Sequence, residues 1–230
     1  MYLSRANKFL YVAVPRTASN TTQALLTSLV PPTGDDLVFK LYPKSPPYSK
    51  AELQHYHATP SLIIENNWMQ PSDFDTYTSF GFVRDPIERW VSTFFLARST
   101  GRLMSNKDNV ELMQEILDGD ITWPVAHEPI PTRVKKVLPG PVQFTWRRML
   151  DFFHLRGKQV VDAYHWQDFR EVVGDVTGQT VTDTEWVDLN RAGIPDEFRQ
   201  PPEKWLSSAY ALKLRERLRD DYDFYEKQKR

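Results

Sequence analysis

The chain has 230 residues, of which 40% are hydrophobic and 13% aromatic, so it is long and apolar enough to fold around a sizeable core. Its 29 basic and 30 acidic residues nearly cancel to a net charge of -1, which argues against a general binder of nucleic acid or membrane surfaces. The absence of cysteine excludes disulfides, thiolate metal sites and cysteine nucleophiles.

The sequence carries no signal for export or membrane insertion. Residues 1–8 lack the apolar core of a signal peptide, and no apolar run approaches the roughly 18 residues needed to span a bilayer. We therefore expect a soluble, cytoplasmic protein with no membrane partner. No internal repeat or dividing linker is visible, so residues 1–230 are expected to form one domain; the oligomeric state is not readable.

The first recognisable unit is a strand, a short polar loop and a helix. Residues 9–14 (Phe-Leu-Tyr-Val-Ala-Val) predict a buried strand, central in a parallel sheet, and residues 20–29 predict a helix capped by Ser19 or Asn20. The free N–H groups and the positive end of the helix dipole point at such a loop. This arrangement is a ready anion site.

The side chains of this loop strengthen the anion-site interpretation. Arg16 adds a permanent positive charge, and four hydroxyls add hydrogen-bond donors, namely those of Thr17, Ser19, Thr21 and Thr22. The loop lacks the Gly-x-x-x-x-Gly-Lys-Ser/Thr pattern of nucleotide triphosphatases, so we expect it to hold a phosphate without the metal machinery of that class. Taken alone, the loop fits an ordinary strand-to-helix turn equally well.

A second strand, residues 79–83, leads directly into Arg84-Asp85-Pro86. Asp85 is expected to cap a helix that begins at Pro86, with Glu88 at the capping-box position. Arg84 leaves the carboxyl end of the strand, where ligands of α/β proteins usually bind.

Ser92 lies seven residues after this cap, which is close to two helical turns, so it returns to the face of Asp85. Arg84 and Ser92 could therefore hold one phosphate from two sides. The alternative for the dipeptide without context is that Arg84 pairs with Asp85 or Glu88 and Ser92 has no special role.

The remaining pattern alternates strands and helices. It predicts an α/β fold with a central, mainly parallel sheet flanked by helices. The expected elements are a short strand at 37–41, a short helix near Thr59-Pro60-Ser61, helices at 108–118 and 146–153, a strand at 159–164, a helix at 168–177 ended by Gly178, and one long terminal helix at 207–230.

A histidine is the natural candidate for a proton acceptor near neutral pH. His57 and His55 are two residues apart, and periodicity alone does not choose between them. The other three histidines (127, 154 and 165) have no spacing that suggests a metal site.

Taken in order, these pieces resemble the sulfotransferase family that uses 3′-phosphoadenosine 5′-phosphosulfate, and most closely its carbohydrate-type branch. Residues 15–22 are similar to the family's Pro-Lys-Thr-Gly-Thr-Ser-like loop, and residues 84–92 are similar to its Arg-Asp/Asn-Pro…Arg…Ser signature. The segment His57-Ala58-Thr59-Pro60 resembles the family segment with the catalytic base, which favours His57 over His55. Gln143, residues 160–173 and the terminal helix also fit the family pattern, so the resemblance covers most of the chain.

The resemblance implies a fold like that of the P-loop nucleotide kinases and a role for each matching residue. The 5′-phosphosulfate would be held by the loop residues Arg16, Thr17, Ala18, Ser19, Asn20, Thr21 and Thr22. The 3′-phosphate would be held by Arg84 and Ser92. His57 would act as general base toward an acceptor hydroxyl, expected on a sugar or glycan. Arg16 would stabilise the departing phosphate oxygen, and no metal is implied.

Three departures from the family loop bear on donor binding. Arg16 stands where the family usually has lysine, and its planar fork spreads the charge differently. Ala18 and Asn20 replace small or hydroxylated family residues. Two alternatives to a sulfotransferase therefore stay open, a non-catalytic nucleotide-binding protein of the same fold and a nucleotide-dependent phosphotransferase.

The acceptor side of the site is the least defined part of the sequence. Residues 123–141 form a long loop with five prolines that also contains His127, Arg133, Lys135 and Lys136. It is a candidate wall of the acceptor site, and a solvated basic loop is at least as good an interpretation.

Overall fold

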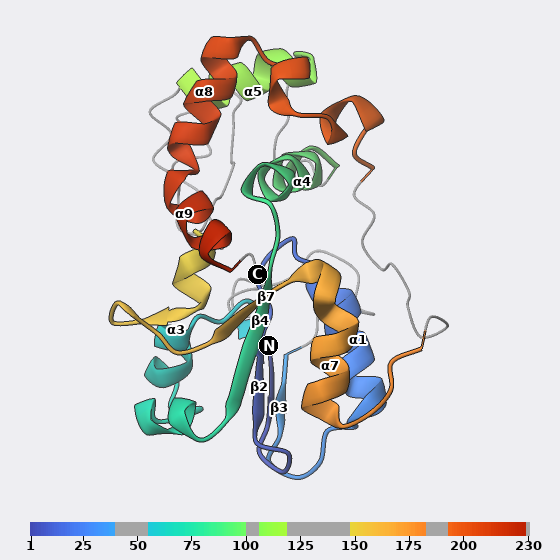
Figure 1. Ribbon diagram of the computed structural model, residues 1–230, viewed down its shortest axis with the longest axis vertical. Coiled ribbons are helices and arrows are strands. Elements are labelled where there is room, and N and C mark those ends of the chain that lie inside the picture. Colours follow the sequence, from blue (N-terminus) through green and yellow to red (C-terminus); the bar gives the residue numbers. More distant parts are fainter. Residues whose placement is uncertain (40–54, 100–105, 119–147, 183–192, 229–230) are drawn as a thin grey trace. The chain divides into compact units, whose positions relative to one another are not determined.

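The computed structural model describes residues 1–39, 55–99, 106–118, 148–182 and 193–228 (Figure 1). These residues group into two compact units, one within residues 1–84, 148–190 and 224–230 and the other within 85–147 and 191–223. We describe each unit by itself, and the expectation of a single domain over 1–230 stays a prediction. The candidate acceptor loop at 123–141 and Gln143 lie outside the described residues.

The first unit is built on a five-stranded sheet in the order β3-β1-β2-β4-β7. Its strands are β1 (Tyr2–Ser4), β2 (Phe9–Val12), β3 (Leu37–Val38), β4 (Thr78–Val83) and β7 (Asp162–His165). The central trio β2, β4 and β7 is parallel, whereas β1 runs antiparallel to both β2 and β3. This confirms the predicted α/β class with a mainly parallel sheet.

Both faces of this sheet are covered, which is why its strands read as continuous apolar runs. Tyr11 and Phe80 pack with α1 (Ser19–Leu29) and α7 (Phe169–Thr177), which lie side by side on one face (Figure 1). The other face packs against α3 (Pro60–Glu65) and two 3₁₀ turns, η1 (Pro71–Asp75) and η2 (Met149–Phe152). A small ribbon of β5 (His154–Leu155) and β6 (Lys158–Gln159) and the turn η3 (Trp166–Asp168) complete the unit.

The second unit is helical. Its core joins α4 (Pro86–Ser99), α5 (Asn109–Asp118), α8 (Ser208–Arg217) and the short turns η5 (Asp196–Arg199) and η6 (Pro202–Lys204). The first residues of α9 (Arg219–Lys227) also belong to this unit. Trp90 and Phe94 stack in the centre, with ring centroids 6.1 Å apart. None of the described helices is long and apolar enough to cross a membrane.

Several predicted boundaries are confirmed by local chemistry. The side chain of Thr59 caps α3, and Pro60 occupies its first turn. Gly178 ends α7 in the left-handed conformation, with φ of 67°. The strand predicted at 79–83 corresponds to β4.

Three boundary predictions are wrong. The N-cap of α1 is Ala18, not Ser19 or Asn20, because the chain enters the helix from a left-handed residue one position earlier. The expected terminal helix is two helices that meet at Leu218, a residue buried in the core of the second unit. The strand expected at 159–164 is divided because the backbone amides of Val160 and Val161 both donate to the carbonyl of Phe153 instead of continuing a ladder.

Two further elements are shorter than expected. Of the helix predicted at 146–153, the structure describes only the 3₁₀ turn η2. The strand predicted at 37–41 is described only as β3, since residues 40 and 41 lie outside the described part of the chain.

Candidate active site

The predicted site residues of the first unit gather at one edge of the sheet. Val12 of β2 lies opposite Gly81 of β4, and Val83 of β4 lies opposite His165 of β7, all in parallel register. The segments that follow these strands therefore leave the sheet at its carboxyl edge, the usual ligand-binding edge of α/β proteins. They carry Arg16, Arg84 and Trp166 respectively.

The loop between β2 and α1 has an unusual backbone. Arg16 and Ala18 both adopt positive φ, 67° and 57°, a region that non-glycine residues rarely occupy. The hydroxyl of Thr17 donates to the carbonyl of Val14 at 2.9 Å, and that of Thr22 donates to the carbonyl of Ala18 at 3.3 Å. These two hydrogen bonds stabilise the conformation of the loop. The positive φ values of Arg16 and Ala18 are a form of backbone strain that is typical of functional sites.

The amino end of α1 lacks a side-chain cap from its N-cap residue. Ala18 occupies the N-cap position and supplies no side-chain hydrogen bond. Alternating left-handed residues turn successive backbone amides toward one side, which makes a concave anion-binding "nest", and the helix dipole adds a partial positive charge there. The loop thus has the backbone features of a phosphate site although its sequence differs from that of the nucleotide triphosphatases.

The strain at Ala18 leads to a prediction about stability. Because glycine adopts positive φ without a steric penalty, Ala18→Gly is expected to raise the free energy of unfolding by up to about 1 kcal/mol. Ala18→Val is expected to lower it by about 2 kcal/mol, because a β-branched residue is poorly tolerated in this conformation. Urea unfolding of the two variants and the wild type measures both changes; a glycine variant less stable than the valine variant would contradict the left-handed conformation.

His57 is held against the strand that leads into this loop. Its side chain is only 8% exposed, and its Nδ1 lies 2.5 Å from the carbonyl oxygen of Ala13. Because a carbonyl can only accept, Nδ1 carries the hydrogen of the neutral ring, and Nε2 then carries the lone pair. In this tautomer Nε2 is the nitrogen able to accept a proton.

Tyr56 connects the histidine segment to the start of α1. Its hydroxyl donates to Oδ1 of Asn20 at 2.5 Å, and its ring meets the ring of His57 edge to face, with centroids 4.5 Å apart. The backbone nitrogen of Met1 donates to the carbonyl of Tyr56 at 2.6 Å and fixes the segment to β1. Sequence reasoning passed over Tyr56, although an aromatic residue next to the candidate base was the available signal.

His55 has a different environment. Its ring packs between those of Phe39 and Trp68, with centroid distances of 5.1 Å and 5.0 Å. The third pair of this cluster, Phe39 and Trp68, is 4.7 Å apart. His55 is thus a packing residue of an aromatic cluster, whereas His57 lies beside the loop.

The signature that follows β4 is divided between the two units. Arg84 belongs to the first unit, and its guanidinium carbon lies 5.7 Å from the ring centroid of Trp166. Ser92 is buried on α4 in the second unit, with 1% of its side chain exposed. That both residues contact one phosphate therefore stays a prediction.

The helix cap predicted in this signature is confirmed. Oδ1 of Asp85 accepts the backbone amides of Ile87 and Glu88, at 2.9 Å and 3.1 Å. The hydroxyl of Tyr222 also approaches this carboxylate, at 3.4 Å, and burial together with the charge of Asp85 raises the pKa of Tyr222. The amino end of α4 is thus capped by a side chain of the second unit, as the sequence predicts.

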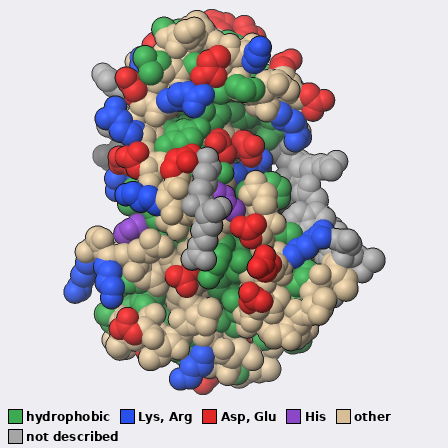
Figure 2. Space-filling view, in the orientation of Figure 1, with side chains coloured by type: hydrophobic (Ala, Val, Ile, Leu, Met, Phe, Trp, Pro, Cys, Tyr) green, Lys and Arg blue, Asp and Glu red, His purple; other side chains and the backbone are tan. Residues whose placement is uncertain are grey.

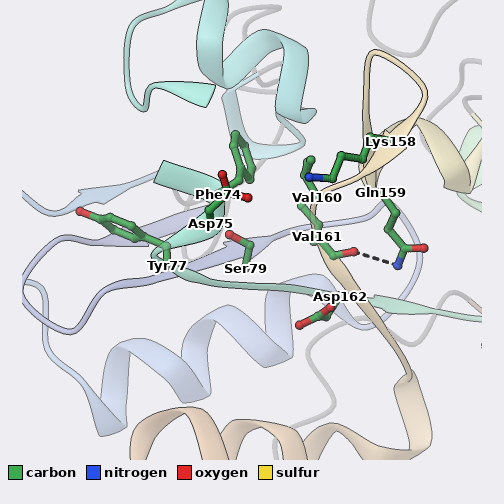
Figure 3. Close-up of a pocket in the computed structure, with 9 residues that line it drawn as sticks. All are labelled: Phe74, Asp75, Tyr77, Ser79, Lys158, Gln159, Val160, Val161 and Asp162. Atoms are coloured by element: carbon green, nitrogen blue, oxygen red, sulfur yellow. Dashed lines mark hydrogen bonds between the residues drawn. The ribbon is translucent and has the colours of Figure 1, made fainter. Parts of the chain in front are cut away.

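A hollow of about 330 Å³ lies at the other edge of the same sheet (Figure 3). It is lined by residues at the amino ends of β4 and β7, including Ser79 and Asp162, together with Asp75 and Lys158. Ser79 and Arg84 are separated by five residue steps along β4, which is roughly 17 Å at the usual rise per residue. This hollow is therefore not part of the site at the carboxyl edge.

Acidic and basic side chains are interspersed over the face shown in Figure 2. This mixture agrees with the near-zero net charge of the sequence. That the chain binds no nucleic acid stays a prediction.

Comparison with known proteins places the chain in a family. The model of the sulfotransferase family matches residues 1–118, which is more than half of the sequence and includes the loop at 15–22, His57 and the stretch 84–92. The chain belongs to the sulfotransferase family. No curated protein and no solved structure matches the chain significantly. Strand β7 and Trp166 lie beyond the matched residues.

Proposed function

We propose that this protein transfers a sulfuryl group from 3′-phosphoadenosine 5′-phosphosulfate to a hydroxyl group, with His57 as the general base. The observation that supports this most strongly is the parallel pairing of β2 and β4. It brings the loop with Arg16 and the strand end with Arg84 to the same edge of the sheet, as a ligand with two separate phosphates requires.

The loop at 15–22 suits the 5′ end of the donor. It combines the amino end of α1, which has no side-chain cap from Ala18, with the positive charge of Arg16. In sulfuryl transfer, as in phosphoryl transfer, the protein forms no covalent bond to the transferred group. Catalysis therefore depends on positioned hydrogen-bond donors and a fixed positive charge that stabilise the transition state. Arg16 is proposed to stabilise the charge that builds on the departing phosphate oxygen.

His57 supplies the proton acceptor. Its Nε2 takes the proton of the acceptor hydroxyl as that oxygen attacks the sulfur in line. The new bond joins the acceptor oxygen to sulfur, and the electron pair of the broken sulfur–oxygen bond goes to the 5′-phosphate. Held by the carbonyl of Ala13 and the ring of Tyr56, the imidazole needs little reorientation for this step.

Sulfotransferase family membership implies an acceptor that bears a hydroxyl group. A sugar or glycan is the proposed acceptor, on the resemblance of residues 57–60 and 84–92 to the carbohydrate-type branch. Sulfate transfer to a panel of free sugars, glycans and phenols, with sulfur-labelled donor, would identify the class.

Calorimetric titration with adenosine 3′,5′-bisphosphate, combined with the labelled-donor assay, tests the proposal. Binding together with transfer supports it. Binding without transfer to any acceptor indicates a non-catalytic nucleotide-binding protein. Absence of binding together with magnesium-dependent consumption of ATP indicates a phosphotransferase and contradicts the proposal.

The role proposed for Arg84 has its own test. Arg84→Ala is expected to weaken adenosine 3′,5′-bisphosphate about 10- to 100-fold, because a charge-assisted contact with the 3′-phosphate is lost. The affinity for adenosine 5′-monophosphate should change little. Arg170→Ala, at an exposed arginine of the same unit, is the matched control and should leave both affinities unchanged. Equal affinity of wild type and Arg84→Ala for the bisphosphate would remove the assignment.

A further inference from the structure

Tyr56 contacts both the proposed base and the helix start that is proposed to hold the donor. Its ring meets the ring of His57 edge to face, with centroids 4.5 Å apart. Its hydroxyl donates to Oδ1 of Asn20, the second residue of α1, at 2.5 Å. One side chain therefore spans the distance from the group that would take a proton to the loop that would bind the phosphosulfate.

The reach of Tyr56 follows from the way in which residues 56–58 cross the edge of the sheet. Tyr56 belongs to the core cluster that the sheet forms with α1, whereas Ala58 belongs to the cluster on the other face. His57 lies between them, with Nδ1 2.5 Å from the carbonyl oxygen of Ala13. The chain thus changes faces at the histidine, and the residue before it lies on the side of α1.

Tyr56 is well suited to fix a distance. It is 1% exposed, its carbonyl accepts from the backbone nitrogen of Met1 at 2.6 Å, and a tyrosine side chain has only two rotatable torsions. The contact with Ala13 fixes one atom of the His57 ring, but a ring held at one atom can still tilt. The ring of Tyr56 supplies a second point of contact, and the hydroxyl connects that point to α1.

We propose that Tyr56 is a positioning residue, which sets the distance between the base His57 and the donor loop through its hydrogen bond to Asn20. The inference rests on the proposed function, since it assumes that His57 is the base and that the loop at 15–22 binds the 5′ end of the donor. In-line transfer requires the acceptor oxygen, which the base holds, to lie at the right distance from sulfur. A misplacement of about 1 Å can cost about 100-fold in rate.

The test begins with Tyr56→Phe, which removes only the hydroxyl and keeps the ring against His57. With saturating sulfur-labelled donor and acceptor, it is expected to lower the turnover number about 5- to 50-fold. The dissociation constant of adenosine 3′,5′-bisphosphate should stay within about threefold of wild type, because every group proposed to contact this nucleotide is still present. A variant that weakens the nucleotide as much as it slows transfer would overturn the inference, and so would one with wild-type turnover.

Tyr2→Phe is the matched control. Tyr2 is buried in the same unit, and its hydroxyl donates to the carbonyl of Val30, at the other end of α1, at 2.7 Å. This variant loses an equivalent hydrogen bond between a buried tyrosine and α1, but away from the site, and it should keep the wild-type turnover.

Two double-mutant cycles separate positioning of the base from a general effect on the fold. In the His57→Asn background, Tyr56→Phe should cause no further loss of turnover, because the base that Tyr56 positions is absent. Asn20→Ala breaks the same hydrogen bond from its other side and should itself slow transfer, and Tyr56→Phe should then add nothing. Losses of turnover that multiply in either double variant would overturn the inference.

The wild-type protein and His57→Asn distinguish a failure of this inference from a failure of the proposed function. Wild-type protein that transfers no sulfuryl group contradicts the proposed function and the inference with it. Wild-type transfer that His57→Asn abolishes and Tyr56→Phe leaves intact contradicts only the role of Tyr56.

Discussion

Replacing His57 with asparagine is expected to lower the rate of sulfuryl transfer by about 10²- to 10⁴-fold, the usual contribution of a general base. Asparagine can still donate a hydrogen bond to the carbonyl of Ala13, as Nδ1 of the histidine does, but it has no basic lone pair. The substitution therefore removes the proton acceptor while it keeps the contact that holds the segment. The measurement is the turnover number with sulfur-labelled donor.

Two further measurements separate a chemical role of His57 from a structural one. The affinity for adenosine 3′,5′-bisphosphate should stay within about twofold of wild type, because the proposed base contacts the acceptor and not this product. The wild-type rate should fall at acidic pH as the base becomes protonated, and the asparagine variant should lose this dependence. A His57→Asn variant with full activity would show that the base is another group.

His55→Ala is the matched control for this experiment. The ring of His55 packs against Phe39 and Trp68, so its removal should lower stability and leave the turnover of the folded protein unchanged. Sequence periodicity could not separate the two histidines; the contacts of the folded chain distinguish them. If His55→Ala lost activity and His57→Asn did not, the two roles would have to be exchanged.

The parts of the fold that local sequence determines were predictable. The apolar runs before Pro15 and Arg84 became β2 and β4, and the Asp85-Pro86 pair began α4 as expected. Strand ends and helix starts depend on residues that are neighbours in the sequence, so these two loops could be located. Their meeting at one edge of the sheet followed from the rules for parallel strands.

Features that depend on distant contacts or rare conformations were not predictable. Alanine seldom adopts positive φ, so nothing in the sequence indicated Ala18 as the cap of α1. The break at Leu218 was hidden because the apolar residues continue almost in phase across it. The contact of Trp166 with Arg84 was not predictable, because it depends on the pairing of β4 with β7, which are far apart in the sequence.

Arg89, the second arginine of the 84–92 stretch, forms a structural ion pair, unlike Arg84, for which a role in ligand binding is proposed. Arg89 is 2% exposed, and its Nη1 lies 3.2 Å from Oδ2 of Asp221, which is 1% exposed. The pair connects α4 to α9 within the second unit. Although Arg89 belongs to a stretch that resembles a phosphate-binding signature, its partner in the structure is a buried carboxylate.

Arg89→Leu is therefore expected to destabilise the protein by about 3–5 kcal/mol, because it leaves the carboxylate of Asp221 buried without its cationic partner. Urea unfolding followed by circular dichroism measures this loss. The exposed pair of Arg215 with Glu203 in the same unit is the matched control, and Arg215→Ala should cost at most about 1 kcal/mol.

The double variant Arg89→Leu/Asp221→Leu decides whether the loss comes from the uncompensated charge or from packing. Removing both charges abolishes the burial penalty, so the double variant should regain most of the stability that Arg89→Leu loses. If the two losses add instead, the ion pair is not the source of the effect. If folded Arg89→Leu protein has lost affinity for adenosine 3′,5′-bisphosphate, Arg89 acts on the ligand as well, and the division between a structural Arg89 and a binding Arg84 is wrong.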